Sequence, residues 1–387
     1  MSEGFGSAMS PTVDASALLE EVCVVLRRFI VWRGDEQIDF VALWVLHTYV
    51  FHLFDITPYL DISSASKRSG KSRLLEVLEM RARSWMIVGA SEAALFRKIH
   101  NVHPTLLVDE VDATFGKDPQ STEGLRAIFN AGYQVNGTVP RCVGNSFTPT
   151  DFSVYCPKAF AGLDGLPDTV RDRSGRIELR RRARHEPKPE RLLHRRIASQ
   201  LSGLAARLDQ WAQWVEMSEA LSTAVPTLPE VLDDRAYDGC EVLGAIAELA
   251  GGEWPEKGRA AFVAIMGGRE DTDPGMLLLG HIAEAFQSRD VKDREGLVVS
   301  ECEKLTSAEL LRILVDRGDD SPWSGEWGDD IDVSRMRRPA MALARMLRPY
   351  DIHPRDMRVQ KIGGGSVVVK GYHRADFVDP WKRYVAS

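Results

Sequence analysis

The segment Ala65-Ser-Lys-Arg-Ser-Gly-Lys-Ser72 has the residue types and spacing of a loop that binds phosphate groups. In such a loop, backbone N–H groups surround the phosphate oxygens, a lysine reaches the β- and γ-phosphates, and a hydroxyl group binds Mg²⁺. Lys71 and Ser72 have the side chains for the last two roles. The residues expected to bind the nucleotide are Ala65, Ser66, Lys67, Arg68, Ser69, Gly70, Lys71 and Ser72.

The loop departs from the common pattern at its first position, where Ala65 replaces a glycine. A methyl group is tolerated there if the backbone keeps a negative φ, whereas a positive φ would strain it. Gly70 directly precedes Lys71, where close approach of the backbone to phosphate favours a residue without a Cβ. The alternative interpretation is a serine-rich surface turn before an ordinary helix.

An acidic pair, Asp109-Glu110, directly follows the apolar run 105–108. In phosphoryl transfer, Asp109 would bind Mg²⁺ and Glu110 would orient or deprotonate the attacking water, because positioning and charge stabilisation supply most of the catalysis. A carboxylate also ends many strands simply because the chain emerges into water, and Asp112 is expected to be such a solvated loop carboxylate. Together the loop and the acidic pair predict binding and hydrolysis of ATP with Mg²⁺.

These residues need an α/β framework to position them, and the pattern from residue 58 to about 180 predicts one. Expected strands cover 59–62, 85–88, 105–108, 159–162 and 176–179, and expected helices cover 72–82, 92–100 and 122–131. The predicted fold class is therefore α/β, a P-loop NTPase with a parallel sheet and flanking helices, followed by a helical region and a C-terminal winged helix.

The predicted organisation has five parts along the chain. Residues 1–13 form a polar tail, 14–55 a helical lead-in, 56–186 the ATPase core, 187–298 a helical lid region and 299–387 a winged-helix-like domain. Within the last part, Thr306-Ser-Ala-Glu309 predicts a capping box, and two strands at 357–362 and 367–370 predict a hairpin.

Composition indicates a globular protein, with 44% hydrophobic and 27% charged residues among 387. The apolar stretch 40–54 contains two histidines and is too short for a membrane span, so no membrane association is expected. The 5 cysteines are scattered without a Cys-x-x-Cys spacing, which disfavours a disulfide framework and a zinc site. We therefore expect the protein to be located in the reducing cytoplasm.

Basic residues are concentrated near the C-terminus although the net charge is −7. A basic helix beside a basic hairpin is typical of proteins that contact the DNA backbone. The alternative is a winged helix that binds protein. The expected DNA contacts are Arg335, Arg337, Arg338, Arg345, Arg358, Lys361 and Lys370.

Another basic segment, Val170-Arg-Asp-Arg-Ser174, precedes the last expected strand. An arginine at this place could reach the γ-phosphate bound by a neighbouring subunit and neutralise charge that develops during transfer. The arginines at 180–184 are expected to be solvated.

Several motifs together resemble a family of helicase-like P-loop ATPases of unknown function that is common in phages and integrated elements. They are Ala42-Leu-Trp-Val-Leu-His-Thr48, Ser66-Lys-Arg-Ser-Gly-Lys-Ser72, Leu107-Val-Asp-Glu110, Phe129-Asn-Ala-Gly-Tyr133, Lys158-Ala-Phe-Ala-Gly162, Leu166-Pro-Asp-Thr-Val-Arg-Asp-Arg173, Ile246-Ala-Glu-Leu-Ala-Gly-Gly-Glu-Trp254 and Gly371-Tyr-His-Arg374. Members are often fused behind a primase-polymerase domain, which does not precede the motor in this sequence.

More distantly, Val170-Arg-Asp-Arg-Ser-Gly175 is similar to the arginine-finger segment of AAA+ motors. This resemblance implies that Arg173 is the finger, that Arg235 is the sensor arginine of the lid and that Asp164 is a polar sensor. It also implies that the fold is AAA+-like with an α-helical lid, and that the chain forms a homo-oligomeric ring, by analogy a hexamer, with ATP bound between subunits.

We therefore expect an ATP-hydrolysing motor that acts on DNA as a helicase or replication-initiation ATPase of a phage or mobile element. Two alternatives stay open. One is a non-translocating ATPase switch, such as a helicase loader or a phage-defence assembly. The other is a nucleotide-binding scaffold in which Ala65 has abolished hydrolysis, although the intact Asp109-Glu110 pair counts against it.

Overall fold

The structure is a computed structural model, and it describes residues 14–64, 68–79, 83–115, 119–143, 148–163, 166–183, 186–221, 224–267, 274–292, 298–317, 322–327, 336–360 and 364–385. The chain forms two compact units, residues 1–268 and 269–387. Each unit is described by itself below. Among the described residues, no helix is long and apolar enough to cross a membrane.

The first unit is built on a five-stranded sheet in which every pairing is parallel. Its strands are β1 (Tyr59–Ser63), β2 (Ser84–Ile87), β3 (Thr105–Val108), β6 (Lys158–Ala161) and β7 (Ser174–Glu178). Their order across the sheet is β2-β3-β6-β1-β7, so β3 and β7 lie on opposite sides of β1. The predicted α/β class with a parallel sheet is confirmed, and the five expected strands are present within two residues at each end.

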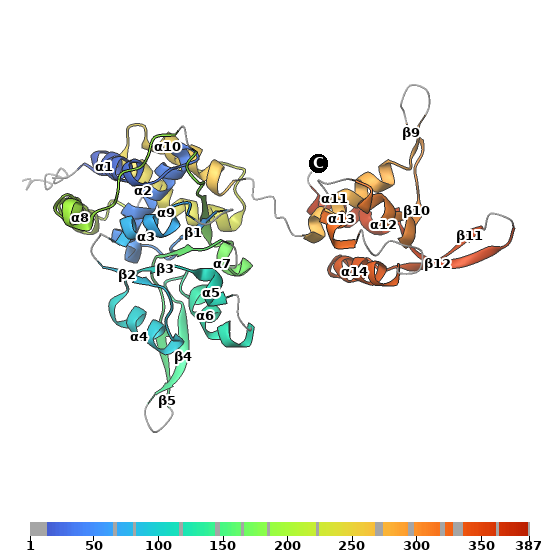
Figure 1. The fold of residues 1–387 in the computed structure, drawn as a ribbon, viewed down its shortest axis with the longest axis horizontal. Coiled ribbons are helices and arrows are strands. Elements are labelled where there is room, and N and C mark those ends of the chain that lie inside the picture. The colour runs from blue at the N-terminus through green and yellow to red at the C-terminus, as the bar shows by residue number, and fades with distance from the viewer. Residues whose placement is uncertain are drawn as a thin grey trace, which may run out of the picture. The chain divides into compact units, whose positions relative to one another are not determined.

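Helices cover both faces of this sheet, which is why its central strands are buried throughout (Figure 1). Successive strand residues point to opposite faces. Leu60 and Ile62 thus pack into one core, while Tyr59 packs into the other. Helices on the second face are α4 (Glu92–Val102), α5 (Val111–Phe115) and α6 (Pro119–Ala131), and the short α7 (Asp168–Arg171) precedes β7.

The first face carries α3 together with the helices from before and after the sheet. They are α3 (Lys71–Glu79), α1 (Ala15–Phe29), α2 (Asp35–Val50), α8 (His194–Ser218), α9 (Asp234–Ala250) and α10 (Trp254–Ile265), and they share one core. A 3₁₀ turn, η1 (Phe51–Leu53), follows α2. The lead-in and the helices after the sheet, expected as separate parts, thus form one layer because their apolar faces pack on each other (Figure 1).

A β-hairpin formed by β4 (Thr138–Val143) and β5 (Thr148–Ser153) projects from the second face of the sheet (Figure 1). The sequence reasoning missed it. Its strands are largely exposed and carry proline, serine and threonine, so they lack the apolar run that predicts a buried strand. Phe152 holds the hairpin on α4 by an edge contact with Phe96, at 4.7 Å between ring centroids.

A buried ammonium group connects this hairpin to the sheet. Lys158, fully buried at the start of β6, donates hydrogen bonds to the hydroxyl of Tyr59 (3.1 Å) and to the carbonyls of Gly132 (3.1 Å), Val154 (3.2 Å) and Cys156 (2.9 Å). Burial lowers the pKa of Lys158. Gly132 has to lack a side chain, because a Cβ there would lie 2.4 Å from Nζ of Lys158 and 2.2 Å from the carbonyl oxygen of Val154.

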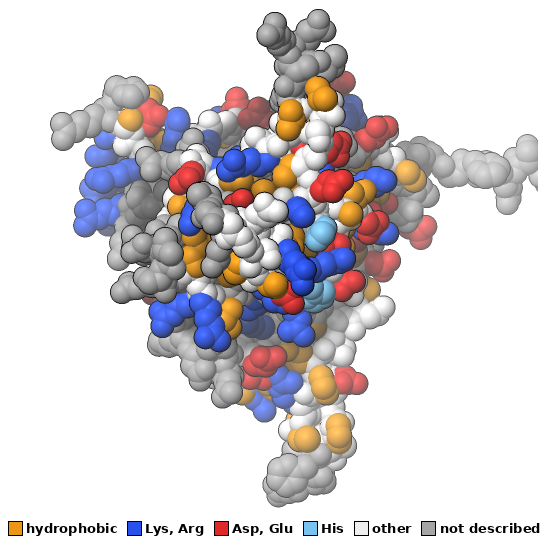
Figure 2. All heavy atoms as spheres, turned by 90° about the vertical axis from the view of Figure 1, so that its right-hand side faces the viewer, with side chains coloured by type: hydrophobic (Ala, Val, Ile, Leu, Met, Phe, Trp, Pro, Cys, Tyr) orange, Lys and Arg blue, Asp and Glu red, His pale blue; other side chains and the backbone are white. Residues whose placement is uncertain are grey.

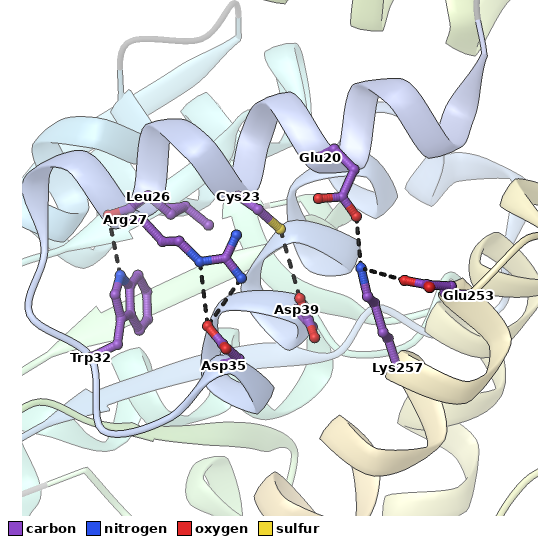
Figure 3. A network of polar contacts seen from close by, with 9 residues as sticks. All are labelled: Glu20, Cys23, Leu26, Arg27, Trp32, Asp35, Asp39, Glu253 and Lys257. Carbon is purple, nitrogen blue, oxygen red and sulfur yellow. Dashed lines mark hydrogen bonds and ion pairs between the residues drawn. The ribbon is translucent and has the colours of Figure 1, made fainter.

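Ion pairs and hydrogen bonds join α1, α2 and α10 (Figure 3). Lys257 pairs with Glu20 of α1 at 2.8 Å and with Glu253 at 3.5 Å. The thiol of Cys23 lies 3.8 Å from the carboxylate of Asp39, and burial raises the pKa of both groups, that of Cys23 to about 12. The charged form of Asp39 is thus disfavoured in the native state, because burial removes water from its carboxylate.

The second unit packs helices against a three-stranded antiparallel sheet of order β10-β12-β11. Its elements are α11 (Pro274–Gln287), β8 (Val291–Lys292), β9 (Val298–Ser300), β10 (Lys304–Thr306), α12 (Ser307–Val315), α13 (Pro322–Trp327), α14 (Arg337–Leu347), η3 (Arg348–Tyr350), β11 (Arg355–Gln360), β12 (Ser366–His373), η4 (Arg374–Phe377) and α15 (Val378–Tyr384). The capping box at Thr306 and Glu309 is present. Helix α11, expected in the lid region, packs into this unit's core.

Replacing Lys158 by Met should destabilise the first unit. The buried carbonyl groups would lose their donor, and each unsatisfied group costs about 1–3 kcal/mol. We expect the free energy of unfolding, measured by urea titration, to fall by about 3–5 kcal/mol. The exposed Lys98→Met, which loses a cation–π contact with Trp85, should cost about 1 kcal/mol. A Lys158→Met protein as stable as wild type would contradict the role of this ammonium group.

Replacing Asp39 by Asn should make the protein more stable at pH 8. Because burial raises the native pKa of Asp39, the charged form is penalised only in the native state, and the penalty is complete above that pKa. The gain in free energy of unfolding should therefore shrink as the pH falls toward the unfolded pKa of about 4. A gain that grows toward acid pH would show that Asp39 is stabilised as a carboxylate.

Candidate functional site

The carboxyl ends of β1 and β3 place the predicted phosphate loop and the acidic pair at one edge of the sheet. β6 lies between these strands, pairing Ile62 of β1 with Ala161 and Val108 of β3 with Phe160. Beyond β1, the chain leads to α3, which begins at Lys71. Beyond β3 come Asp109 and Glu110, so the structure brings Lys71 and the acidic pair to the same edge.

The end of the loop has the backbone conformation that glycine favours. Gly70 has φ of 103° and Arg68 has φ of 67°, both in the left-handed region. The carbonyl of Gly70 accepts the N–H of Leu74 at 2.9 Å, which starts α3. Ala65, Ser66 and Lys67, which are predicted to bind the nucleotide, lie outside the described residues, so the conformation expected at Ala65 stays a prediction.

The ammonium group of Lys71 lies at the centre of the site. Its Nζ donates to the hydroxyl of Ser64 at 2.5 Å, across the loop. Burial lowers the pKa of Lys71, whereas the carboxylates of Asp112 and Asp109 act in the opposite direction. Both carboxylates are thus close enough to interact electrostatically with this cation.

The backbone of the acidic pair is in the left-handed region at Glu110. Glu110 adopts φ of 55°, and its N–H donates to the side chain of Asp109 at 2.9 Å. Glu110 is exposed and Asp109 is half-buried. In the described part of the chain, no group of three or more His, Cys, Asp or Glu side chains could hold a metal ion by itself.

Asp112 is not the solvated loop carboxylate that the sequence reasoning expected. Its two carboxylate oxygens accept the backbone N–H of Leu163 at 3.1 and 2.8 Å, which ties the start of α5 to the loop after β6. A Cβ on Gly162 would lie 3.0 Å from Asp112. The sequence carried no local signal for this contact, because the donor lies 51 residues further along the chain.

A cavity of about 640 Å³ extends from the loop along α3. Its lining includes residues from the end of α1, the loop, α3 and the segment 182–191: Phe29, Ile30, Val31, Arg68, Ser69, Gly70, Lys71, Ser72, Arg73, Glu76, Arg182, Lys188, Pro189 and Arg191. The sequence reasoning missed the last four, because a basic run after a strand is usually solvated. Its volume is within the range of small-molecule sites.

The family match concerns the later part of the chain. Residues 178–384 match the family described as "Protein of unknown function (DUF3631)", which is more than half of the chain. The chain belongs to this family. The matched stretch contains the segment 182–191, whereas the phosphate loop and the acidic pair precede it.

A relative from Saccharopolyspora erythraea, named "Uncharacterized 28.9 kDa protein in xis 5'region", is 32% identical over 194 residues. The alignment covers 49% of this chain and 63% of the relative, so the chain spans less than two thirds of that protein. A solved apo structure of the C-terminal region of NrS-1 aligns with 94% of this chain and 76% of its own, at 11% identity and a TM-score of 0.38.

The predicted arginine finger and lid arginine lie away from Lys71. The carbonyl of Arg173 accepts the N–H of Tyr59 at 3.0 Å, which places Arg173 at the amino edge of the sheet, opposite the loop. Its guanidinium donates to the carbonyl of Thr169 and lies 5.7 Å from the ring centroid of Tyr133. Arg235 pairs with Asp172 at 2.6 Å. Asp164 lies outside the described residues.

Arg171, the other arginine of that segment, has partners within its own chain. Its guanidinium lies 3.8 Å from the carboxylate of Asp61 and 3.4 Å from that of Asp168. Within the described part of one chain, neither Arg173, the predicted finger, nor Arg235, the predicted sensor arginine, thus lies beside Lys71.

Basic residues of the second unit are exposed on α14 and on the β11–β12 hairpin. They are Arg337, Arg338, Arg345, Arg358 and Lys370, while Arg335 and Lys361 lie outside the described residues. Lys370 pairs with Asp356 at 2.9 Å. On the face drawn in Figure 2, Lys and Arg side chains form several groups among acidic and apolar ones.

Replacing Gly70 by Ala should destabilise the loop. Space is available, since an added Cβ would meet no atom within 4 Å, so the cost comes from φ of 103° alone. Backbone strain of this kind costs about 1–3 kcal/mol, measurable as a lower free energy of unfolding. The control Gly203→Ala, within α8 and with only Arg207 near its Cβ, should stabilise by about 0.5–1 kcal/mol. A Gly70→Ala protein as stable as its control would contradict the loop geometry.

Proposed function

We propose that the first unit binds ATP with Mg²⁺ and hydrolyses it. The observation that carries the proposal is the placement of Lys71: it starts α3, donates to Ser64 at 2.5 Å and shares one sheet edge with Asp109 and Glu110. Ligands of parallel α/β sheets bind outside the carboxyl ends of the strands, which supports this assignment.

The loop and α3 would bind the phosphates. The amino end of a helix attracts anions because its first N–H groups lack partners within the helix, and α3 has nine residues. The ammonium group of Lys71 would exchange the hydroxyl of Ser64 for a phosphate oxygen. Arg68, Ser69, Gly70 and Ser72 line the same cavity and would surround the phosphates.

The residues of the edge fit Mg²⁺, which takes oxygen ligands and commonly uses one or two carboxylates together with substrate phosphates. Ser72 offers an exposed hydroxyl and Asp109 a half-buried carboxylate. When bound, the ion would neutralise charge on the phosphate groups. Glu110, exposed beside Asp109, would orient the attacking water, and Asp112 would hold the loop after β6 in place.

Arg173 can contribute only from a neighbouring subunit. β1 has five residues, which at about 3.3 Å each separates the two edges by about 15 Å. An arginine at the amino edge of one subunit would contact ATP at the carboxyl edge of the next, as in an AAA+ ring. This supports the predicted homo-oligomer, with a hexamer as the expected form.

The second unit would bind DNA as a winged helix. The order α12, α14 and then the β11–β12 hairpin supports this assignment, as do the exposed basic side chains on α14 and the hairpin. The complete proposal is an AAA+-type motor that acts on DNA, a helicase or replication-initiation ATPase of a phage or mobile element. The alternatives are a non-translocating ATPase switch and a scaffold that binds nucleotide without hydrolysis.

ATP hydrolysis should fall by about 100-fold or more in Lys71→Ala and Glu110→Gln, since each removes a group that stabilises or orients the transferring phosphoryl group. The measurement is phosphate release with and without single- or double-stranded DNA, with Lys98→Ala as control. Arg173→Ala should also be inactive, and mixing it with inactive Lys71→Ala should restore part of the activity, because mixed rings contain complete interfaces.

Each outcome of this assay decides between the candidates. DNA-stimulated hydrolysis supports the motor, and hydrolysis indifferent to DNA supports the switch. Nucleotide binding without hydrolysis supports the scaffold. Full activity of Lys71→Ala would overturn the assignment of the site.

A further inference from the structure

The segment 182–191 adds a second basic wall to the cavity beside the phosphate loop. Lys188 and Arg191 line this cavity together with Lys71 and Arg73, and Glu76 is the acidic residue of the lining. A cavity with this excess of positive charge attracts an anionic ligand. The charge of the second wall is additional to that of the loop.

Hydrogen bonds join the described residues on the two sides of positions 184 and 185. Arg182 donates to the carbonyls of Ala183 (2.9 Å) and Glu186 (2.7 Å), and the N–H of Ala183 donates to the side chain of Glu186 at 2.8 Å. Arg182 therefore has partners next to it in the chain, and these contacts do not involve Lys188 or Arg191.

A second set of contacts fixes the segment on the end of α1. The N–H of Glu190 donates to the carbonyl of Arg28 at 3.0 Å, and the guanidinium of Arg28 pairs with the carboxylate of Glu190 at 2.5 Å. In the described part of the chain, Lys188 and Arg191 make no hydrogen bond or ion pair, and both are exposed. Their charges are thus not neutralised by contacts among the described residues.

The position of the segment determines which end of a nucleotide it would meet. It follows β7, which lies on the opposite side of β1 from β3 and Asp109. Next to Lys188 in the chain, Pro189 also lines the cavity, as does Val31 after α1, and these apolar residues are suited to cover a base or sugar. Arg235, in contrast, pairs with Asp172 beside Arg173 at the amino edge.

We propose that Lys188 and Arg191 bind the phosphate nearest the sugar of the nucleotide, the part that ATP and ADP share. This inference rests on the proposed function of the site. It assigns to the segment after β7 the nucleotide contact that was expected of Arg235. Since Glu190 holds this segment on α1, the end of α1 becomes part of the nucleotide site.

The test measures binding of fluorescently labelled ATP and ADP to the full chain. The double variant Lys188→Ala/Arg191→Ala should bind both nucleotides about tenfold more weakly, and by the same factor. The matched control, Arg195→Ala/Arg196→Ala, removes two exposed charges near the start of α8, and it should bind within about twofold of wild type because long-range electrostatics alone is screened by salt. Arg235→Ala should also bind like wild type.

Unchanged binding by the double variant would overturn the inference and leave the proposed function standing, provided that Lys71→Ala loses binding. Weakened ATP binding with normal ADP binding would also overturn it, because the cations would then act at the γ-phosphate. A wild-type protein that binds neither nucleotide would overturn both proposals.

Discussion

The burial of β1 on both faces is the constraint on which the first unit depends. All five of its residues are buried, and β6 and β7 satisfy its backbone on both sides. Its side chains alternate between two cores, so helices must cover both faces. The two ends of β1 then define two chemically different edges, with Ser64 and Lys71 at one and Arg173 at the other.

The separation of these edges shapes the proposed chemistry. The groups proposed to bind phosphate and metal collect at the carboxyl edge, where parallel strands end together. Arg173 lies at the amino edge beside Tyr133, whereas Arg171 approaches Asp61 in the middle of β1 and lines a small cavity with Asp112 and Leu163. In the proposed assembly of identical subunits, the amino edge of one chain would meet the carboxyl edge of the next.

The sequence predicted the sheet well, because its strands are short apolar runs bounded by charged or small residues. Thr105–Val108 was expected to the residue. The β4–β5 hairpin escaped because its exposed strands have no apolar periodicity.

Local spacing was enough to single out Gly70-Lys71-Ser72 and Asp109-Glu110 as a candidate site, and their roles stay predictions. Local spacing was not enough where an interaction depends on contacts between distant segments. Asp112 was misjudged because its partner, the N–H of Leu163, belongs to another loop. The same holds for Lys188 and Arg191, which reach the cavity only because Glu190 is fixed on Arg28.

The sequence by itself thus determined the α/β class, the phosphate-loop candidate and the acidic pair, since short-range spacing encodes them. The tertiary structure decided that β6 lies between β1 and β3, that Arg173 and Arg235 lie far from Lys71, and that the segment 182–191 completes the cavity. The physical reason is that strand order and long-range ion pairs result from packing of both sheet faces, which no local pattern records.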